Sequence, residues 1–266
     1  MEKAMATIHF LGTCSGTEPM PNMHHCSFVI KTENYNYWFD AGENCAHRAH
    51  TTGIDVMKTR ALFVSHPHLD HVGGLPNLLA CMRKLVWRQK RKLVCDNSME
   101  VFFPGLPYFQ MLKSVACNGS STFRFLFNMN EHEVADGLLY EDEVVKVSAI
   151  HNRHMKEDGT NGWHSYSYLI ELEGKKIVYS GDVAEPCELD PFMEGGCDIY
   201  IMETGHHPVS AVCEYAISRG AKELIFNHHG REILENRPAC ERLVADYAKG
   251  ANISIKLAYD GMEESI

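Results

Sequence analysis

The sequence of 266 residues lacks any apolar run of 18 residues, which excludes a membrane-spanning helix of the usual length. Residues 1–10 lack the long apolar core and the cleavage site of a secretory signal, so we expect none. The ten cysteines include no Cys-x-x-Cys pair, and most of them lie within apolar runs. This pattern indicates reduced thiols in a cytoplasmic protein rather than a disulfide framework.

An excess of cations is also lacking, because the formal net charge is −10. Such a charge argues against broad nucleic-acid binding, although two divalent cations would make a cleft locally positive. No linker, low-complexity segment or strong repeat interrupts the chain, and 45% of the residues are hydrophobic. We therefore expect a single domain over residues 1–266, of the α/β class.

Histidine is abundant, with sixteen residues, and three of them lie in the pattern His-x-His-x-Asp-His at positions 66–71. The preceding segment, 60–65, is apolar and reads as a buried strand that must end before Pro67. The histidines therefore lie on a strand-to-helix loop. In extended chain, residues two apart point the same way, so His66 and His68 can bind one ion.

Asp70 and His71 project from the turn that follows and can serve a second ion, about 3.5 Å from the first in two-metal hydrolases. Strand-like segments later in the chain also end in metal-binding residue types. Residues 144–150 lead to His151 and His154, of which we favour His154 as the third imidazole of the first ion. His151 remains the alternative.

The segment 175–180 ends in Ser-Gly and is followed by Asp182, whose carboxylate can bridge two cations. The alternative role for Asp182 is to cap the next helix. The segment 222–227 precedes His228, favoured as a ligand of the second ion, and His229, the alternative. The predicted sets are His66, His68, His154 and Asp182 for the first ion, and Asp70, His71, Asp182 and His228 for the second. Nitrogen and oxygen donors suit zinc best, and manganese or iron would also fit.

With these motifs the chain resembles the metallo-β-lactamase superfamily, and within it the ribonuclease Z branch. Besides the histidine motif, the resemblance rests on the opening Leu-Gly-Thr-x-x-Gly loop, the Phe-Asp-x-Gly-Glu segment, the third histidine motif, a strand ending in glutamate and the closing segment. These correspond to Phe10–Thr17, Phe39–Glu43, Val147–His154, Asp198–Thr204 and Ala258–Met262.

The resemblance implies a four-layer αβ/βα sandwich. The apolar pattern supports it independently, because two strand-rich groups flank a helical middle. The expected strands lie near residues 7–11, 26–31, 35–40, 60–65 and 92–95, and then near 144–150, 165–172, 175–180, 198–202, 223–227 and 253–258.

The resemblance also implies a glutamate–histidine pair that donates a proton to the leaving group. Glu203 and His206 are our choice for this pair, with His207 as the alternative and a plain surface cluster as the non-catalytic interpretation. Asp70 would orient the attacking water.

Three functions compete at this stage. We favour a phosphodiesterase acting on RNA or a cyclic nucleotide. A hydrolase of lactones, thioesters or related carbonyl compounds is the second candidate, and a non-catalytic metal-binding protein is the third. The expected partner is a small-molecule or nucleotide/RNA substrate, with no membrane involved, and the sequence leaves a homodimer open.

Two further segments allow two interpretations each. The cation-rich run 83–92 could contact a phosphate chain, but we expect the solvated end of a helix. The aromatic run 123–127 could line a substrate pocket, but we expect a strand packed on the core.

Overall fold

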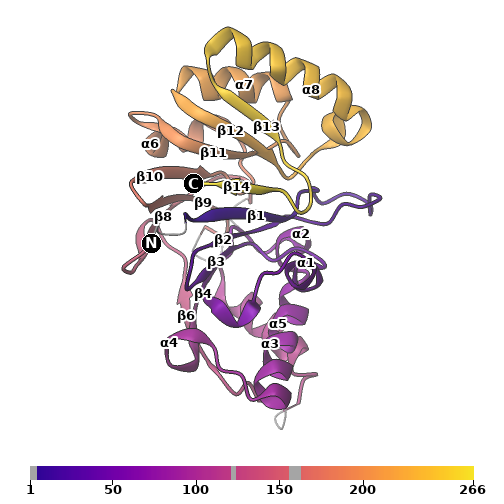
Figure 1. Cartoon of the computed structure of the whole chain (residues 1–266), viewed down its shortest axis with the longest axis vertical. Coiled ribbons are helices and arrows are strands. Elements are labelled where there is room, and N and C mark those ends of the chain that lie inside the picture. The colour runs from indigo at the N-terminus through magenta and orange to yellow at the C-terminus, as the bar shows by residue number, and fades with distance from the viewer. Residues whose placement is uncertain (1–4, 121–123, 156–162) are drawn as a thin grey trace. The chain divides into compact units, whose positions relative to one another are not determined.

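The computed structural model describes residues 5–120, 124–155 and 163–266. The chain divides into two compact units (Figure 1). Unit 1 comprises Met1–Gly12, Pro21–Val134 and Asp260–Ile266, and unit 2 comprises Thr13–Met20 and Ala135–Tyr259. Each unit is described by itself below.

Unit 1 contains a seven-stranded mixed sheet among its described residues. The first three neighbouring pairs are antiparallel and the last three are parallel. In spatial order the strands are β14 (Glu263–Ser265), β1 (Thr7–Gly12), β2 (Ser27–Lys31), β3 (Asn36–Phe39), β4 (Thr59–Phe63), β5 (Ser98–Phe103) and β6 (Asn128–Glu133).

The helices of unit 1 cover one face of this sheet, where α3 and α5 pack against each other. In α3 the buried residues recur at the spacing of one helix face: Leu75, Leu78, Leu79, Met82 and Val86. The helical segments are α1 (Cys45–Thr51), η1 (Val56–Lys58), α2 (Leu69–Val72), α3 (Leu75–Gln89), α4 (Val94–Asn97) and α5 (Leu106–Ala116).

A ladder of phenylalanines crosses the other face of the same sheet, because alternate residues of a strand point to opposite faces. The ring centroids of neighbouring members lie 4.9–5.8 Å apart, and three of the four pairs are stacked. The ladder consists of Phe10, Phe28, Phe39, Phe63 and Phe102 from five adjacent strands. Stacked aromatic pairs of this kind add to the free energy gained by burial.

Unit 2 contains a second seven-stranded mixed sheet among its described residues. In spatial order its strands are β13 (Ser254–Leu257), β12 (Ala221–Asn227), β11 (Cys197–Glu203), β10 (Lys175–Tyr179), β9 (Tyr166–Leu172), β8 (Val145–His151) and β7 (Gly137–Glu141). Its helices are η2 (Pro186–Leu189), α6 (Asp190–Met193), α7 (Val209–Ser218) and α8 (Arg231–Ala251), and α7 and α8 pack together beside β12 and β13 (Figure 1).

The strand directions in unit 2 determine where its polar loops gather. β10, β11 and β12 are parallel to one another. β8 is antiparallel to β9, which is antiparallel to β10, so β8 and β10 run in the same direction. The carboxyl ends of β8, β10, β11 and β12 therefore lie at one edge of the sheet, the edge at which open α/β sheets bind ligands.

Two mixed sheets with helices confirm the predicted α/β class, and most of the predicted strands are found. The strand predicted near 92–95 is wrong. Cys95, Asp96 and Asn97 all have positive φ, which breaks an extended chain, and β5 begins only at Ser98. The prediction missed β5, β6, β7 and β14.

The two ambiguous segments also have clear positions. The cation-rich run covers the last turns of α3 and its left-handed terminal residue Lys90, as expected for a helix end. In the aromatic run, Phe123 lies outside the described residues. Phe127 is buried in the core of unit 1, but the strand starts after it, at Asn128. Across the described ranges, no helix is long and apolar enough to cross a membrane.

Replacing Phe39 tests the phenylalanine ladder. Its ring is fully buried and stacks between those of Phe28 and Phe63. We expect Phe39→Ala to lower the free energy of unfolding by about 3–5 kcal/mol, the usual cost of this cavity. Urea unfolding of the metal-free protein measures it. The control Met111→Ala, at a side chain that is 58% exposed, should change it by less than about 0.5 kcal/mol. An equally small change for Phe39→Ala would show that the ladder does not stabilise the fold.

Candidate metal centre

In unit 1, the histidine motif begins directly after β4, on a loop that the buried carboxylate of Asp40 holds in place. Ser65 donates its backbone N–H to Oδ1 of Asp40 (2.6 Å) and its hydroxyl to Oδ2 (2.8 Å). Asp40 itself follows β3, the parallel neighbour of β4. The loop is therefore fixed immediately before His66.

Asp40 also orients His71, whose Nδ1 lies 2.8 Å from Oδ2 of Asp40. Both side chains are fully buried. With Nδ1 donating to the carboxylate, the neutral imidazole carries its lone pair on Nε2. A carboxylate that holds a histidine in this way is typical of metal sites, because it fixes the ring and increases its basicity.

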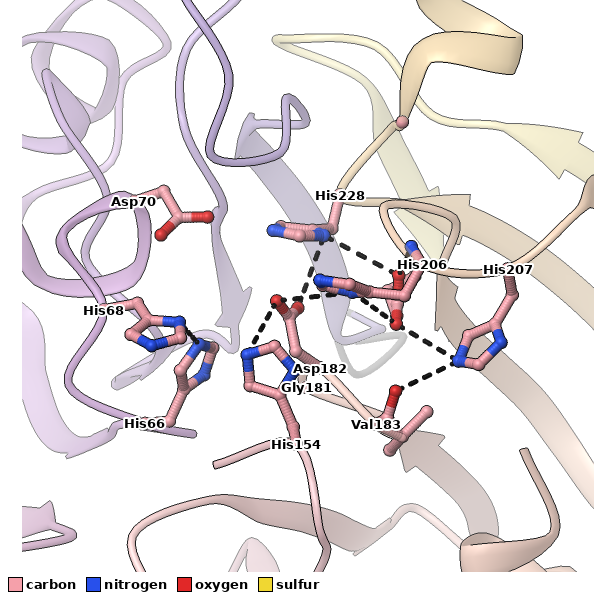
Figure 2. A network of polar contacts seen from close by, with 12 residues as sticks. His66, His68, Asp70, His154, Gly181, Asp182, Val183, His206, His207 and His228 are labelled. Atoms are coloured by element: carbon pink, nitrogen blue, oxygen red, sulfur yellow. Dashed lines mark hydrogen bonds and ion pairs between the residues drawn. The ribbon is translucent and has the colours of Figure 1, made fainter. Parts of the chain in front are cut away.

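The other predicted donors of unit 1 lie around the same loop. Nε2 of His66 and Nδ1 of His68 are 3.0 Å apart, so the two rings converge (Figure 2). Oδ2 of Asp70 lies 3.5 Å from Nε2 of His71. Asp70 and His71 belong to the short helix α2 rather than to a turn. Unit 1 thus brings its four predicted ligands together.

Asp40 is not among the predicted site residues, although it lies in the Phe-Asp-x-Gly-Glu segment. Its position directly after a strand is the same signal that identified Asp182. Asp40 also adopts a positive φ of 57°, which is uncommon outside glycine. The position of Asp40 directly after a strand could have identified it as a supporting residue.

In unit 2, Asp182 follows β10 and its side chain is only 2% exposed. Three imidazoles face its carboxylate (Figure 2). Nδ1 of His228 lies 3.3 Å from Oδ1, whereas Nε2 of His154 and Nδ1 of His206 lie 3.7 and 3.8 Å from Oδ2. The two oxygens therefore face different histidines. The alternative role of Asp182 as a helix cap is not what the structure shows, since Glu185 caps η2.

The two histidines after β8 have different surroundings. His154 faces Asp182, as described above. The ring of His151 instead makes a 2.7 Å contact with Asp136 through Nδ1 and stacks on Trp163, with centroids 4.3 Å apart. Buried Asn152 lies between the histidines, and its Oδ1 accepts hydrogen bonds from the N–H of His154 and from the hydroxyl of Ser165.

The two histidines after β12 also differ. His228 faces Asp182 and has a positive φ of 47°. His229 is completely buried and makes a 2.8 Å hydrogen bond through Nε2 to the carbonyl of Ala258. Burial lowers the pKa of His229 to about 4, so the ring is neutral at pH 7. His229 therefore packs as a neutral, hydrogen-bonded core residue.

Glu203 lies at the end of β11, and both following histidines contact it. The N–H and Nδ1 of His206 lie 2.9 and 3.0 Å from its two oxygens. Nε2 of His207 lies 3.4 Å from Oε1 of Glu203 and donates to the carbonyl of Val183 at 3.0 Å (Figure 2). The side chain of His206 is 43% exposed and that of His207 only 10%.

The hydrogen bond to Glu203 raises the pKa of His206. Burial acts to raise the pKa of Glu203, but hydrogen bonds from His206 and His228 hold it below its usual value. Each partner thus favours the charged form of the other. The pair therefore favours the protonated form of the His206 imidazole.

Gly205 allows this close packing. A Cβ at this position would lie 2.8 Å from the ring of His228 and 3.3 Å from Oε2 of Glu203. Any larger residue would therefore have to displace the imidazole or the carboxylate. The glycine between Glu203 and His206 is required by this close approach.

Asp182 and His228, the predicted ligands in this part of unit 2, lie in a cluster of donor atoms that suits a divalent cation. Donor atoms of Asp182, Glu203, His206 and His228 all lie within 4.8 Å of one another. Two of these residues are buried carboxylates, whose charges repel each other unless cations or protons compensate them. Imidazole nitrogen and carboxylate oxygen are ligands for zinc, manganese and iron. No thiolate belongs to this group.

A family model described as anti-Pycsar protein Apyc1 matches residues 6–208 of the chain. Two ribonucleases Z are similar in sequence. That of Pyrococcus abyssi is 37% identical over 229 residues, which cover 69% of each protein. That of Methanothermobacter thermautotrophicus is 24% identical over 277 residues, which cover 84% of this chain and 86% of the relative. The chain spans about half the length of several bacterial relatives, such as 49% of the ribonuclease Z of Listeria monocytogenes.

Among solved structures, the metallo-β-lactamase fold protein YhfI from Bacillus subtilis aligns with a TM-score of 0.74 at 14% identity. The alignment covers 99% of this chain and all of that protein. This likeness shows that the chain has the predicted metallo-β-lactamase fold.

The two pairs of neighbouring histidines provide a direct test of the ligand assignment. We expect His154→Ala and His228→Ala to reduce bound metal strongly, because these rings face Asp182. His151→Ala and His229→Ala should retain it, because these rings bond to Asp136 and Ala258. Elemental analysis of the four purified variants measures the difference. A reversal within either pair would show that the other histidine is the ligand.

Proposed function

Because the chain belongs to the family described as anti-Pycsar protein Apyc1, in the ribonuclease Z-like branch of the metallo-β-lactamase superfamily, we propose that it is a dinuclear metal-dependent phosphodiesterase. One observation above all supports the proposal. One oxygen of buried Asp182 faces His228 and the other faces His154, an arrangement that suits a carboxylate shared by two cations. A metal-dependent hydrolase of the phosphodiesterase class also agrees with the ribonuclease Z relatives.

We assign the ligands as the sequence predicts them. His66, His68 and His154 would bind one ion, Asp70, His71 and His228 the other, and Asp182 both. The nitrogen-rich donor set makes zinc our first choice, with manganese and iron as alternatives.

When bound, two divalent cations lower the pKa of water and neutralise charge on the phosphate oxygens of the substrate. The residues of the chain supply the remaining functions. Asp70 orients the attacking water by accepting its hydrogen bond. Asp40 keeps His71 in the tautomer whose Nε2 can bind a cation.

His206 donates the proton that the leaving group needs, and the carboxylate of Glu203 holds its ring. His206 holds its Nδ1 proton against Oε1 of Glu203, so the proton on Nε2 is the one to be transferred. The raised pKa of His206 favours the protonated ring, the form that a general acid needs. His207 also contacts Glu203, but its Nε2 already donates to Val183, so we assign the transfer to His206.

The proposed substrate is a nucleotide phosphodiester, either RNA or a cyclic nucleotide. The net charge of −10 opposes binding of a long polyanion, which favours a small substrate such as a cyclic nucleotide. We also propose a cytoplasmic protein, because all ten cysteines are free thiols. A homodimer stays a prediction.

Loss of the bridging carboxylate should remove metal. We expect the zinc-reconstituted protein to bind close to two equivalents and to hydrolyse bis-p-nitrophenyl phosphate. Asp182→Ala should lose at least one equivalent, measured by elemental analysis, together with most of the activity. Unchanged metal and activity in this variant would refute the bridging role. Hydrolysis of a homoserine lactone or an acyl thioester, without hydrolysis of a phosphodiester, would instead identify a carbonyl hydrolase. Absence of all three activities would indicate a metal-binding protein without catalysis.

The proton-donating pair can be tested through the leaving group. On an alkyl phosphodiester, Glu203→Gln and His206→Ala should lower kcat by about 10²-fold or more, as expected for loss of a general acid. The loss should shrink on a nitrophenyl phosphodiester, whose leaving group departs without a proton. Metal content, measured in parallel, should remain near two equivalents. Equal losses on the two substrates would mean that the pair supports the structure and does not transfer a proton.

A further inference from the structure

Glu188, in the short helix η2, has a side chain that is only 9% exposed and accepts hydrogen bonds from two separate loops. One loop carries His154, and the other carries Asp182. Neither the sequence motifs nor the proposed mechanism gives Glu188 a role.

The first oxygen of Glu188 contacts the loop after β8. Oε1 accepts hydrogen bonds from the backbone N–H of Arg153 (3.0 Å) and from its Nε (2.6 Å). Arg153 directly precedes His154, so the bond to its backbone fixes the chain one residue before the imidazole. The guanidinium contributes less to positioning, because this side chain is 62% exposed.

The second oxygen contacts the loop after β10. Oε2 accepts hydrogen bonds from the backbone N–H groups of Ala184 (3.0 Å) and Glu185 (3.2 Å). Ala184 lies two residues after Asp182. One carboxylate thus joins the two loops through four N–H donors.

We propose that Glu188 is a positioning residue that sets the separation of His154 and Asp182 for metal binding. The inference rests on the proposed function, in which both residues are ligands. Nε2 of His154 and Oδ2 of Asp182 lie 3.7 Å apart, a separation that one cation can span when it binds both. A shift of either loop would change this distance.

Only a full-length carboxylate can perform this role. Both oxygens accept and neither donates, which matches two sets of N–H donors. In Glu188→Gln, one oxygen becomes an NH₂ group that would face the N–H donors of one loop. In Glu188→Asp, the charge remains but the side chain is one methylene too short to reach both loops.

The test is metal affinity, measured by competition with a chelator on the whole chain loaded with zinc. We expect Glu188→Gln and Glu188→Asp to bind zinc about 10–100-fold more weakly than the unaltered protein, the usual effect of losing a group that supports a ligand. Excess zinc should restore most of kcat, because the ligands themselves remain. Urea unfolding of the metal-free variants separates this effect from a general loss of stability.

Two control variants separate positioning from charge. Arg153→Ala removes the guanidinium but keeps the backbone N–H, so its zinc affinity should stay close to that of the unaltered protein. Glu194→Gln removes an exposed carboxylate of the same unit and should also leave the affinity unchanged. If Arg153→Ala weakens zinc as much as Glu188→Gln, the guanidinium and not the backbone clamp is responsible, and the inference is wrong.

The zinc affinities of His154→Ala and Asp182→Ala, measured in the same way, distinguish a failure of the positioning role from a failure of the proposed ligand set. If both lose zinc while the Glu188 variants bind it normally, the positioning role is wrong and the proposed ligands remain. If His154→Ala and Asp182→Ala bind zinc normally, the proposed ligand set fails, and the role of Glu188 fails with it. Should Glu188→Gln not fold, Glu188→Asp decides between these outcomes.

Discussion

The buried carboxylate of Asp182 is the group on which the arrangement of unit 2 depends. Burying an ionised carboxylate costs several kcal/mol unless charge or hydrogen bonds compensate it. Here a second carboxylate, Glu203, is buried in the same cluster, so the repulsion between two anions adds to that cost. His206 and His228 each contact both carboxylates, which places two imidazoles between two negative charges. The cluster has the electrostatic balance of a cation-binding site.

The backbone around Asp182 is held by several independent bonds. His207 donates to the carbonyl of the next residue, Val183, and Glu188 holds the two residues after that. These bonds come from loops that follow different strands of the same sheet. Because the carboxyl ends of β8, β10, β11 and β12 share one edge, short loops are enough to bring the side chains together. The sheet therefore positions the site, and the loop hydrogen bonds refine it.

Most of the strands and the candidate ligands could be predicted from sequence, because each candidate ligand follows an apolar, strand-like run. That change from apolar to metal-binding residue types identified His154, Asp182 and His228. The choice of His154 over His151 and of His228 over His229 stays a prediction. The strand β6 could not be found in this way. Its sequence, Asn128–Glu133, is polar and its side chains are mostly exposed at the sheet edge, so it shows no apolar alternation.

Other features depend on contacts between distant residues, which no local pattern reveals. Glu188 is 35 residues from Arg153 in sequence, and Asp40 is 31 residues from His71. The bond of Glu188 to Glu185 belongs to a local capping box, but no neighbouring residue indicates its bonds to Arg153. The residues beside Asp40 likewise do not indicate its contact with His71. The wrong strand near 92–95 has a local cause instead, since three successive residues with positive φ cannot be inferred from their side chains.

The three hydrogen bonds of Asp40 have a consequence for metal selectivity. They run between protein groups, so the orientation of His71 is set by the fold of unit 1 and not by the ion. In zinc fingers, by contrast, the free energy of metal binding drives the folding of the chain. A ligand that the fold already orients offers an ion a fixed direction of approach. Discrimination between zinc, manganese and iron would then rest on how well each ion accepts that geometry, together with its supply.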